Sequence, residues 1–138
     1  IHGYESHSDR HLPDEVRLIN INLARIANHL MPDIAVIDGV VGLEGNGPGG
    51  KDSVDFGVSA AGVDTLAVDA VMAAAMGFDP AEIAHFQYSA GLGLGVADLA
   101  QIETVGAQIA DVVHPFKPHE NNETQKQWQR EDAEALLA

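Results

Sequence analysis

Hydrophobic residues recur every three or four positions between Pro13 and Leu30, which is the spacing of one face of an α-helix. The apolar positions that share this face are Val16, Ile19, Leu23, Ile26 and Leu30. Asp14 and Glu15 fall in the first turn, where the helix dipole favours negative charge, and Pro32 stops the helix. The pattern predicts an amphipathic helix over residues 13–30.

Two short runs with the composition of β-strands follow, and a glycine-rich loop separates them. Residues 34–38 are apolar and largely β-branched, which predicts a buried strand. Residues 54–61 alternate in part and predict a second strand. The loop over residues 39–50 holds six of the fourteen glycines of the chain. Residues 102–105 predict a third strand, and residues 109–113 a short further one.

Two more helices are predicted after the second strand. Residues 65–76 consist almost entirely of Leu, Ala, Val and Met, so this helix should be buried on more than one side. Asp64 is a suitable N-cap for it, and Gly77 a suitable residue after its end. The next helix should begin at an Asp-Pro-Ala-Glu capping sequence, residues 79–82, and reach about Ala90.

This order of helices and strands predicts an α/β fold, with a small mixed or mostly parallel sheet covered by helices. The length of 138 residues fits one domain of ordinary size. We expect that domain to span residues 1–118. Residues 119–138 are polar with one Trp and predict a C-terminal tail or a loosely docked helix.

The acidic composition limits the class of partner. A net charge of −14 opposes phosphate backbones and anionic membranes, and it favours cations. No apolar run approaches the roughly 18 residues of a membrane span. We therefore expect neither nucleic acid nor a membrane as a partner.

Cysteine is absent, which excludes a Cys-ligated iron–sulfur cluster or zinc site within this chain. No signal peptide is visible, which favours a cytoplasmic protein. The chain begins at Ile1 rather than Met, which indicates a processed product or a fragment.

The glycine spacing of the loop resembles two phosphate-binding sequence patterns. Residues 45–52 approach G-x-x-x-x-G-K-[ST], and three of the glycines also fit G-x-G-x-x-G. Asp52 stands where Ser or Thr is required, and Pro48 removes a backbone N–H from the loop. Both patterns open a helix, whereas a strand is predicted here. We therefore predict a ligand-binding loop that is not a nucleotide cradle, with Gly45, Asn46, Gly47 and Pro48 as its residues.

Four acidic residues around the loop are the sharper signal. Asp38 ends the first strand, Glu44 lies in the loop, Asp64 begins the buried helix, and Asp69 is the only charged residue of that helix. If the two strands are parallel neighbours, Asp38 and Asp64 emerge at the same sheet edge, where open α/β sheets bind ligands. Carboxylate oxygens suit hard cations, so we hypothesise that these four acids bind Mg²⁺ or Ca²⁺. A plain N-cap role for Asp64 and an ordinary polar contact for Asp69 stay open.

The sequence does not specify a reaction. His85 falls in the second of the later helices, beside Phe86 and Tyr88, where we expect it to be half-buried. No local signature assembles a Ser/His/Asp triad. Whether the protein is an enzyme therefore stays open.

An ordered set of motifs runs through the centre of the chain. Its members are residues 32–39 (PDIAVIDG), 44–48 (EGNGP), 62–69 (GVDTLAVD), 76–80 (MGFDP), 90–93 (AGLG) and 102–106 (IETVG). This set resembles the domain of unknown function 362 family over roughly residues 15–106. The family residues it includes are Asp38, Glu44, Asn46, Gly47, Pro48, Asp64 and Asp69, and no catalytic role comes with them.

The resemblance implies that no activity is established and that ferredoxin-like iron–sulfur modules often accompany such domains. It also implies that the family domain is longer at its N-terminus, so that residues 1–118 would form its C-terminal part. A truncated sheet exposes an edge, which favours a homo-oligomer or binding to the missing N-terminal half.

Three hypotheses follow. The first is a ligand-binding module with its site at the loop of residues 39–50, taking a divalent cation or a small polar ligand. The second is a non-catalytic scaffold that docks a redox partner, with the acidic surface steering a basic protein. The third is a phosphate-binding enzyme that uses the N–H groups of the loop.

Overall fold

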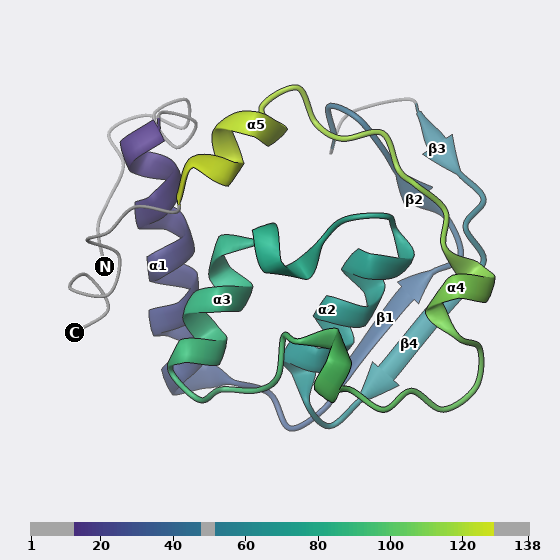
Figure 1. Ribbon diagram of the computed structural model, residues 1–138, viewed down its shortest axis with the longest axis horizontal. Helices are drawn as coiled ribbons and strands as arrows, with labels where there is room; N and C mark the ends of the chain where they lie inside the picture. The colour runs from purple at the N-terminus through teal and green to yellow at the C-terminus, as the bar shows by residue number, and fades with distance from the viewer. Residues whose placement is uncertain (1–12, 48–51, 129–138) are drawn as a thin grey trace.

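The computed structural model describes residues 13–47 and 52–128 and shows helices together with two short antiparallel strand pairs (Figure 1). In chain order the elements are α1 (Pro13–Leu30), β1 (Ala35–Gly39), β2 (Gly42–Leu43), β3 (Ser53–Val54), β4 (Val58–Gly62), α2 (Thr65–Ala75), η2 (Pro80–Glu82), α3 (Ala84–Gly91), η3 (Leu99–Gln101), α4 (Ile109–Val112), α5 (Asn122–Gln125) and η4 (Lys126–Trp128). The predicted α/β class is confirmed. Within these two ranges, no helix combines the length and the apolarity that a membrane crossing requires.

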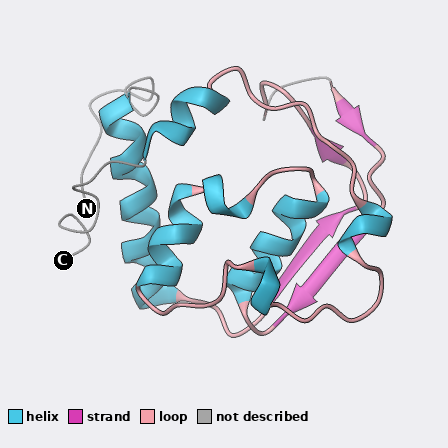
Figure 2. Cartoon of the chain, in the orientation of Figure 1, coloured by secondary structure: helices cyan, strands magenta, loops and turns pink. Residues whose placement is uncertain are grey.

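Helix α2 occupies the middle of the domain. Helices α1 and α3 pack against each other on one side of it, and the β1–β4 pair lies on the other side (Figure 2). Seven of the eleven residues of α2 are buried. Its residues Leu66, Ala70 and Ala73 share a hydrophobic cluster with Phe86 of α3. The predicted buried central helix is therefore confirmed.

Residues 35–47 and 52–62 form the two sides of one long β-arm. At its base β1 pairs antiparallel with β4, and Ala35 lies opposite Gly62. Farther out β2 pairs antiparallel with β3, and Gly42 lies opposite Val54. A parallel arrangement of the first two predicted strands is therefore wrong. Consecutive strands that run antiparallel can be joined by a short connection, whereas parallel neighbours need a crossover connection of a dozen or more residues, usually a helix.

A β-bulge interrupts the arm between its two ladders. Three residues, 55–57, lie opposite two residues, 40–41. Gly57 has a φ of +69°, and its N–H donates to the carbonyl oxygen of Val40 at 3.0 Å. The extra residue and the left-handed glycine are typical of a bulge that bends one strand pair.

One face of the β1–β4 pair is covered by α2, and two glycines make this close approach feasible. A Cβ atom on Gly62 would lie 2.8 Å from Val68 Cγ2, and one on Gly39 would lie 3.0 Å from Met72 Cε. Side chains alternate between the two faces of a strand, so every second residue of β1 points away from α2. Val36 on that outer face is 73% exposed. The sheet therefore has one buried face and one open face.

Residues 114–128, here called the C-terminal strap, run from the β-arm past α2 to α1 (Figure 1). The N–H of Phe116 donates to the carbonyl oxygen of Met76 at 2.9 Å. The buried Phe116 ring meets the Phe56 ring edge-on, with 5.1 Å between centroids. A Cβ atom on Gly42 would lie 2.5 Å from Phe116 Cε2, so glycine at this position leaves room for the ring.

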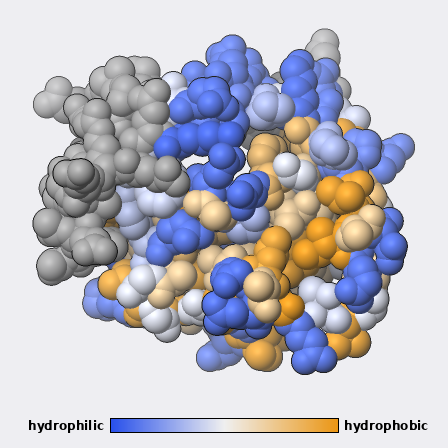
Figure 3. Space-filling model, viewed as in Figure 1, coloured by the Kyte–Doolittle hydropathy of each residue, from blue (hydrophilic) through white to orange (hydrophobic). Residues whose placement is uncertain are grey.

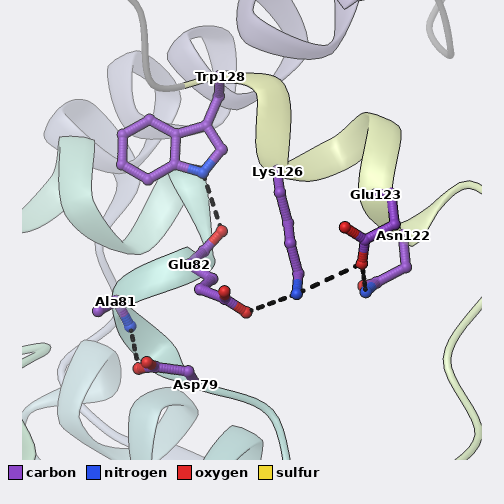
Figure 4. A network of polar contacts seen from close by, with 7 residues as sticks. All are labelled: Asp79, Ala81, Glu82, Asn122, Glu123, Lys126 and Trp128. Atoms are coloured by element: carbon purple, nitrogen blue, oxygen red, sulfur yellow. Dashed lines mark hydrogen bonds and ion pairs between the residues drawn. The ribbon is translucent and has the colours of Figure 1, made fainter.

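The end of the strap is fixed on the helical side of the domain (Figure 4). Trp128 is buried, and its Nε1–H donates to the carbonyl oxygen of Glu82 at 2.8 Å. Its ring meets Tyr88 edge-on, with 5.4 Å between centroids. Lys126 Nζ lies 2.8 Å from Glu82 Oε2 and 3.5 Å from Glu123 Oε1, and hydrogen bonding to Glu82 raises the Lys126 pKa.

The other sequence predictions for the C-terminal half have mixed outcomes. Of the predicted tail or loosely docked helix, residues 119–128 belong to the strap, and residues 129–138 lie outside the described residues. The predicted strand at residues 102–105 is wrong, because this segment has no ladder partner in the described part of the chain. The predicted short strand at residues 109–113 is also wrong, because α4 forms there.

Candidate functional site

The described part of the glycine-rich loop, residues 39–47, contacts the C-terminal strap. Gly45 N–H donates to the carbonyl oxygen of Lys117 at 2.8 Å, and Lys117 N–H donates to Glu44 Oε2 at 2.8 Å. Asn46 Oδ1 accepts from the backbone N–H of Glu120 at 3.0 Å. The remaining predicted loop residues are Gly47, whose Cβ position has no described residue within 4 Å, and Pro48, which lies outside the described residues.

The carboxylates of Asp38 and Asp64 also accept hydrogen bonds from backbone N–H groups. Asp38 Oδ1 accepts from the N–H of Val40 at 3.0 Å. Asp64 caps α2 by accepting from Ala67 N–H at 2.9 Å, and its second oxygen accepts from Val96 N–H at 3.0 Å. Because β1 and β4 are antiparallel, Asp38 lies toward the outer end of the pair and Asp64 just beyond its base. The expectation that both emerge at one sheet edge is therefore wrong.

The described residues do not bring the four acids together. Within residues 13–47 and 52–128, no group of three or more His, Cys, Asp or Glu side chains could hold a metal ion. Glu44 and Asp64 would have to exchange the hydrogen bonds given above for metal bonds. A cation site formed by Asp38, Glu44, Asp64 and Asp69 stays a prediction from sequence.

Asp69 lies in a different setting from the other three acids. It lines a cavity of about 490 Å³ along the edge of β1 that does not face β4, and we call this cavity the β1 groove. Helices α1, α2 and α3 form its other walls. Most of its wall is apolar and includes Leu23, Met31, Ile37, Leu66 and Phe86.

Two pairs of polar residues interrupt this apolar wall. Thr65 and Asp69 come from α2, and His85 and Ser89 come from α3. Each pair is separated by four positions, which places its two side chains on the same face of their helix. Because α2 and α3 pack against each other, the two polar faces meet at one groove.

Thr65 has an unusual hydrogen-bonding state. Its side chain is buried, with 7% of the residue surface exposed, and Oγ1 has no hydrogen-bond partner within residues 13–47 and 52–128. Most buried hydroxyl groups in proteins are paired, so an unpaired one calls for an explanation. Thr65 lines the groove, but its Oγ1 is itself closed to solvent, so a ligand can exchange hydrogen bonds with this hydroxyl once the side chain turns toward the groove.

Burial shifts the two titratable groups in opposite directions. Asp69 reaches solvent, but the apolar wall desolvates its carboxylate in part and raises its pKa. Burial lowers the pKa of His85, and His85 Nδ1 lies 3.0 Å from Asn20 Oδ1. A neutral imidazole that donates from Nδ1 to Asn20 keeps an acceptor lone pair on Nε2. The groove therefore combines an acid, a neutral base and a hydroxyl with an apolar wall.

Sequence reasoning identified part of this groove. Asp69 was singled out as an acid on an apolar helix, and His85 was expected to be half-buried, as it is. Thr65 and Ser89 were missed, although each lies four positions from one of those two residues. That spacing, applied to both helices, was the available signal.

A comparison with protein families agrees with the motif resemblance. The family model described as Domain of unknown function (DUF362) matches residues 2–74. The chain belongs to the DUF362 family. The match includes β1, β4 and nearly all of α2, and therefore Thr65 and Asp69. The DUF362 match ends before α3, so His85 and Ser89 lie outside it.

One curated protein sequence is similar to this chain. The thylakoid-associated protein sll1697 of Synechocystis sp. (strain ATCC 27184 / PCC 6803 / Kazusa) is 36% identical to the chain over 72 residues. This segment is 52% of the present chain and 22% of that relative, so the chain spans less than a quarter of the relative. No solved structure matches the chain significantly. Ligand binding and redox docking therefore stay predictions for this DUF362 protein.

Proposed function

We propose that this DUF362 domain binds a small amphipathic molecule in the β1 groove. The observation that supports this function is the unpaired, buried hydroxyl of Thr65 at the wall of a cavity of about 490 Å³. A buried polar group without a partner costs roughly 1–3 kcal/mol, and a ligand that pairs with it removes this cost. Small-molecule sites typically measure about 300–1,000 Å³ and have apolar walls with a few polar groups.

The polar residues limit the class of ligand. Asp69 accepts hydrogen bonds when it is ionised, and its carboxylate lacks full hydration, so a ligand N–H or O–H is favoured next to it. The net charge of −14 disfavours anionic molecules. The ligand we propose is therefore an alcohol or an amine with an apolar body, not a carboxylate or a phosphate.

Binding of three simple probes tests this function. Cyclohexanol, cyclohexylamine and cyclohexanecarboxylate share a ring and differ in their polar group. In ¹H–¹⁵N spectra of the 138-residue chain, we expect the alcohol and the amine to shift the amides of residues 65–69 and 85–89 in a saturable way. We expect the carboxylate to bind more weakly, because Asp69 and the acidic surface repel it.

A matched pair of variants gives the control. Thr65→Val removes the groove hydroxyl and keeps the shape of the side chain, and it should abolish or strongly weaken binding. Thr104→Val makes the same chemical change outside the β1 groove and should leave binding unchanged. Equal binding by both variants, or probe-induced shifts confined to other parts of the chain, would show that the β1 groove is not the site.

A further inference from the structure

A second cavity, of about 460 Å³, lies on the opposite side of the β1–β4 pair from the β1 groove. We call it the β4 groove. Strand β4 and helix α2 form two of its walls, and residues 102–112 form the third. Val68, Val71 and Met72 of α2 line its floor with apolar atoms. Figure 3 shows hydrophobic residues gathered over α2 and the β1–β4 pair, with hydrophilic residues around them.

The backbone on both sides of the β4 groove suits a β-strand. Among the described residues, β4 has β1 as its sole ladder partner, so its other edge keeps unpaired N–H and C=O groups. Across the cavity, residues 102–105 pair with none of the described strands, and Ile102 is extended, with φ −100° and ψ 122°. The exposed Val63 and Val105, at 81% and 96%, also line the groove. An extended segment between β4 and residues 102–105 would satisfy this edge and cover these side chains.

The charge of the groove indicates the chemistry of that segment. Of the described residues that line it, the two ionisable ones are acidic, Asp64 and Glu103, and none is Lys, Arg or His. Asp64 already accepts two backbone hydrogen bonds, whereas Glu103 is exposed. Together with the net charge of −14, this arrangement favours a basic partner.

We propose that the β4 groove binds an extended, basic segment of a partner protein by β-strand addition. The segment pairs its backbone with β4. Its alternate apolar side chains pack toward Val71 and Met72, and a Lys or Arg lies near Glu103. In this mode of recognition, backbone hydrogen bonds supply affinity, and the pockets for alternate side chains supply specificity.

Binding of short peptides to the 138-residue chain tests this surface. The probe is a fluorescently labelled eight-residue peptide in which Val and Lys alternate. Two control peptides replace Lys by Glu or carry N-methyl groups on alternate backbone amides, which prevents strand pairing. We expect saturable anisotropy for the Val/Lys peptide alone, together with slower amide hydrogen exchange in residues 58–62.

Three variants locate the binding. Glu103→Lys should weaken binding about fivefold or more through charge reversal, whereas Glu120→Lys changes the net charge equally outside the groove and should have less effect. Ala107→Trp places a bulky side chain at an exposed position of the groove wall and should abolish binding without changing the melting temperature.

Four outcomes would overturn the proposal. The first two are equal binding of the N-methylated peptide and binding that survives in Ala107→Trp. The third is an equal loss in both charge-reversal variants, which would indicate a general effect of net charge. The fourth is a concentration-dependent dimer that Ala107→Trp abolishes, which would assign the groove to a second copy of this chain.

Discussion

Asp64 and Val96, which are 32 positions apart, are joined by a hydrogen bond of 3.0 Å from the Val96 N–H to Asp64 Oδ2. The other oxygen of the same carboxylate caps α2 through Ala67 N–H. One side chain therefore starts the central helix and also fixes the loop that follows α3. The N-cap role that the sequence indicated for Asp64 is therefore confirmed, and the bond to Val96 adds a second role to it.

Replacing Asp64 by alanine should destabilise the domain. Loss of an N-cap costs about 1 kcal/mol, and the orphaned Val96 N–H adds about 1–2 kcal/mol. The free energy of unfolding from urea titration should fall by about 2–3 kcal/mol. Asp38→Ala is the matched control, because its bond to Val40 N–H is exposed, and it should cost less than about 1 kcal/mol. Equal losses in both variants would contradict the double role of Asp64.

Gly42→Ala should loosen the strap from the β-arm. The added methyl group would lie 2.5 Å from Phe116 Cε2, and overpacking of this kind costs about 1–3 kcal/mol. Gly47→Ala is the control, because no described residue lies within 4 Å of its Cβ position, and it should change stability by less than about 0.5 kcal/mol. Thermal melts of both variants make the comparison, and similar melting temperatures would count against a packed contact at Gly42.

Trp128→Ala should release the end of the strap. The side chain is buried among Ile21, Ala24, Ala84 and Tyr88, and removal of a buried Trp costs about 3–5 kcal/mol. Trp128→Phe keeps much of the packing and loses the bond to the Glu82 carbonyl, so its cost should be smaller. In unfolding titrations, Trp128→Ala should lose more free energy of unfolding than Trp128→Phe. A loss below about 1 kcal/mol in Trp128→Ala would show that the strap end is not part of the core.

Thr65→Val should leave the domain equally stable or make it more stable by up to about 1–2 kcal/mol, because it replaces an unpaired buried hydroxyl with a methyl group of the same shape. Ser89→Ala is the comparison at a neighbouring buried residue of the same groove, because it removes a hydroxyl without replacing the volume that the hydroxyl fills. The free energy of unfolding should be lower for Ser89→Ala than for Thr65→Val. If Thr65→Val is clearly destabilised in calorimetry, the hydroxyl has a partner and the proposed ligand site loses its support.

His85 should make stability depend on pH below about 6.5. Burial lowers its pKa in the folded state, so the unfolded chain takes up the proton first as the pH falls. The stability that neutral His85 contributes is complete above pH 6.5, and it is lost as the pH falls from there through the lowered pKa of the folded state. Denaturation between pH 5 and 8 should show a smaller slope for His85→Gln than for the exposed His29→Gln. Identical slopes would contradict the burial of His85.

Local features of this fold were predictable from local patterns. The α1 pattern, the Asp64 cap and the apolar α2 each depend on residues within a few positions of one another. The helix expected from Asp79 to Ala90 is instead divided into η2 and α3, because Ile83 between them has extended angles, with φ −94° and ψ 109°. A capping sequence marks where a helical turn begins, but it does not specify how far that turn continues.

Contacts between residues far apart in the chain could not be predicted from the sequence. The hydrogen bonds from Lys117 to Glu44 and from Glu120 to Asn46 span 73 and 74 positions, and no periodicity reports contacts at that range. The antiparallel pairing of β1 with β4 was not predictable either, because the two strand patterns are compatible with both parallel and antiparallel pairing. The β1 groove was predictable only in part, because it needs two helices to present their polar pairs to one cavity.

The strap also sets an order of events during synthesis. Ile21 and Ala24 leave the ribosome about a hundred residues before Trp128, the ring that completes their cluster. Contacts at such separation close slowly, and exposed apolar surface invites aggregation in the interval. This domain therefore completes its core only after Trp128 has emerged, and a nascent chain that ends before the strap should depend on chaperones.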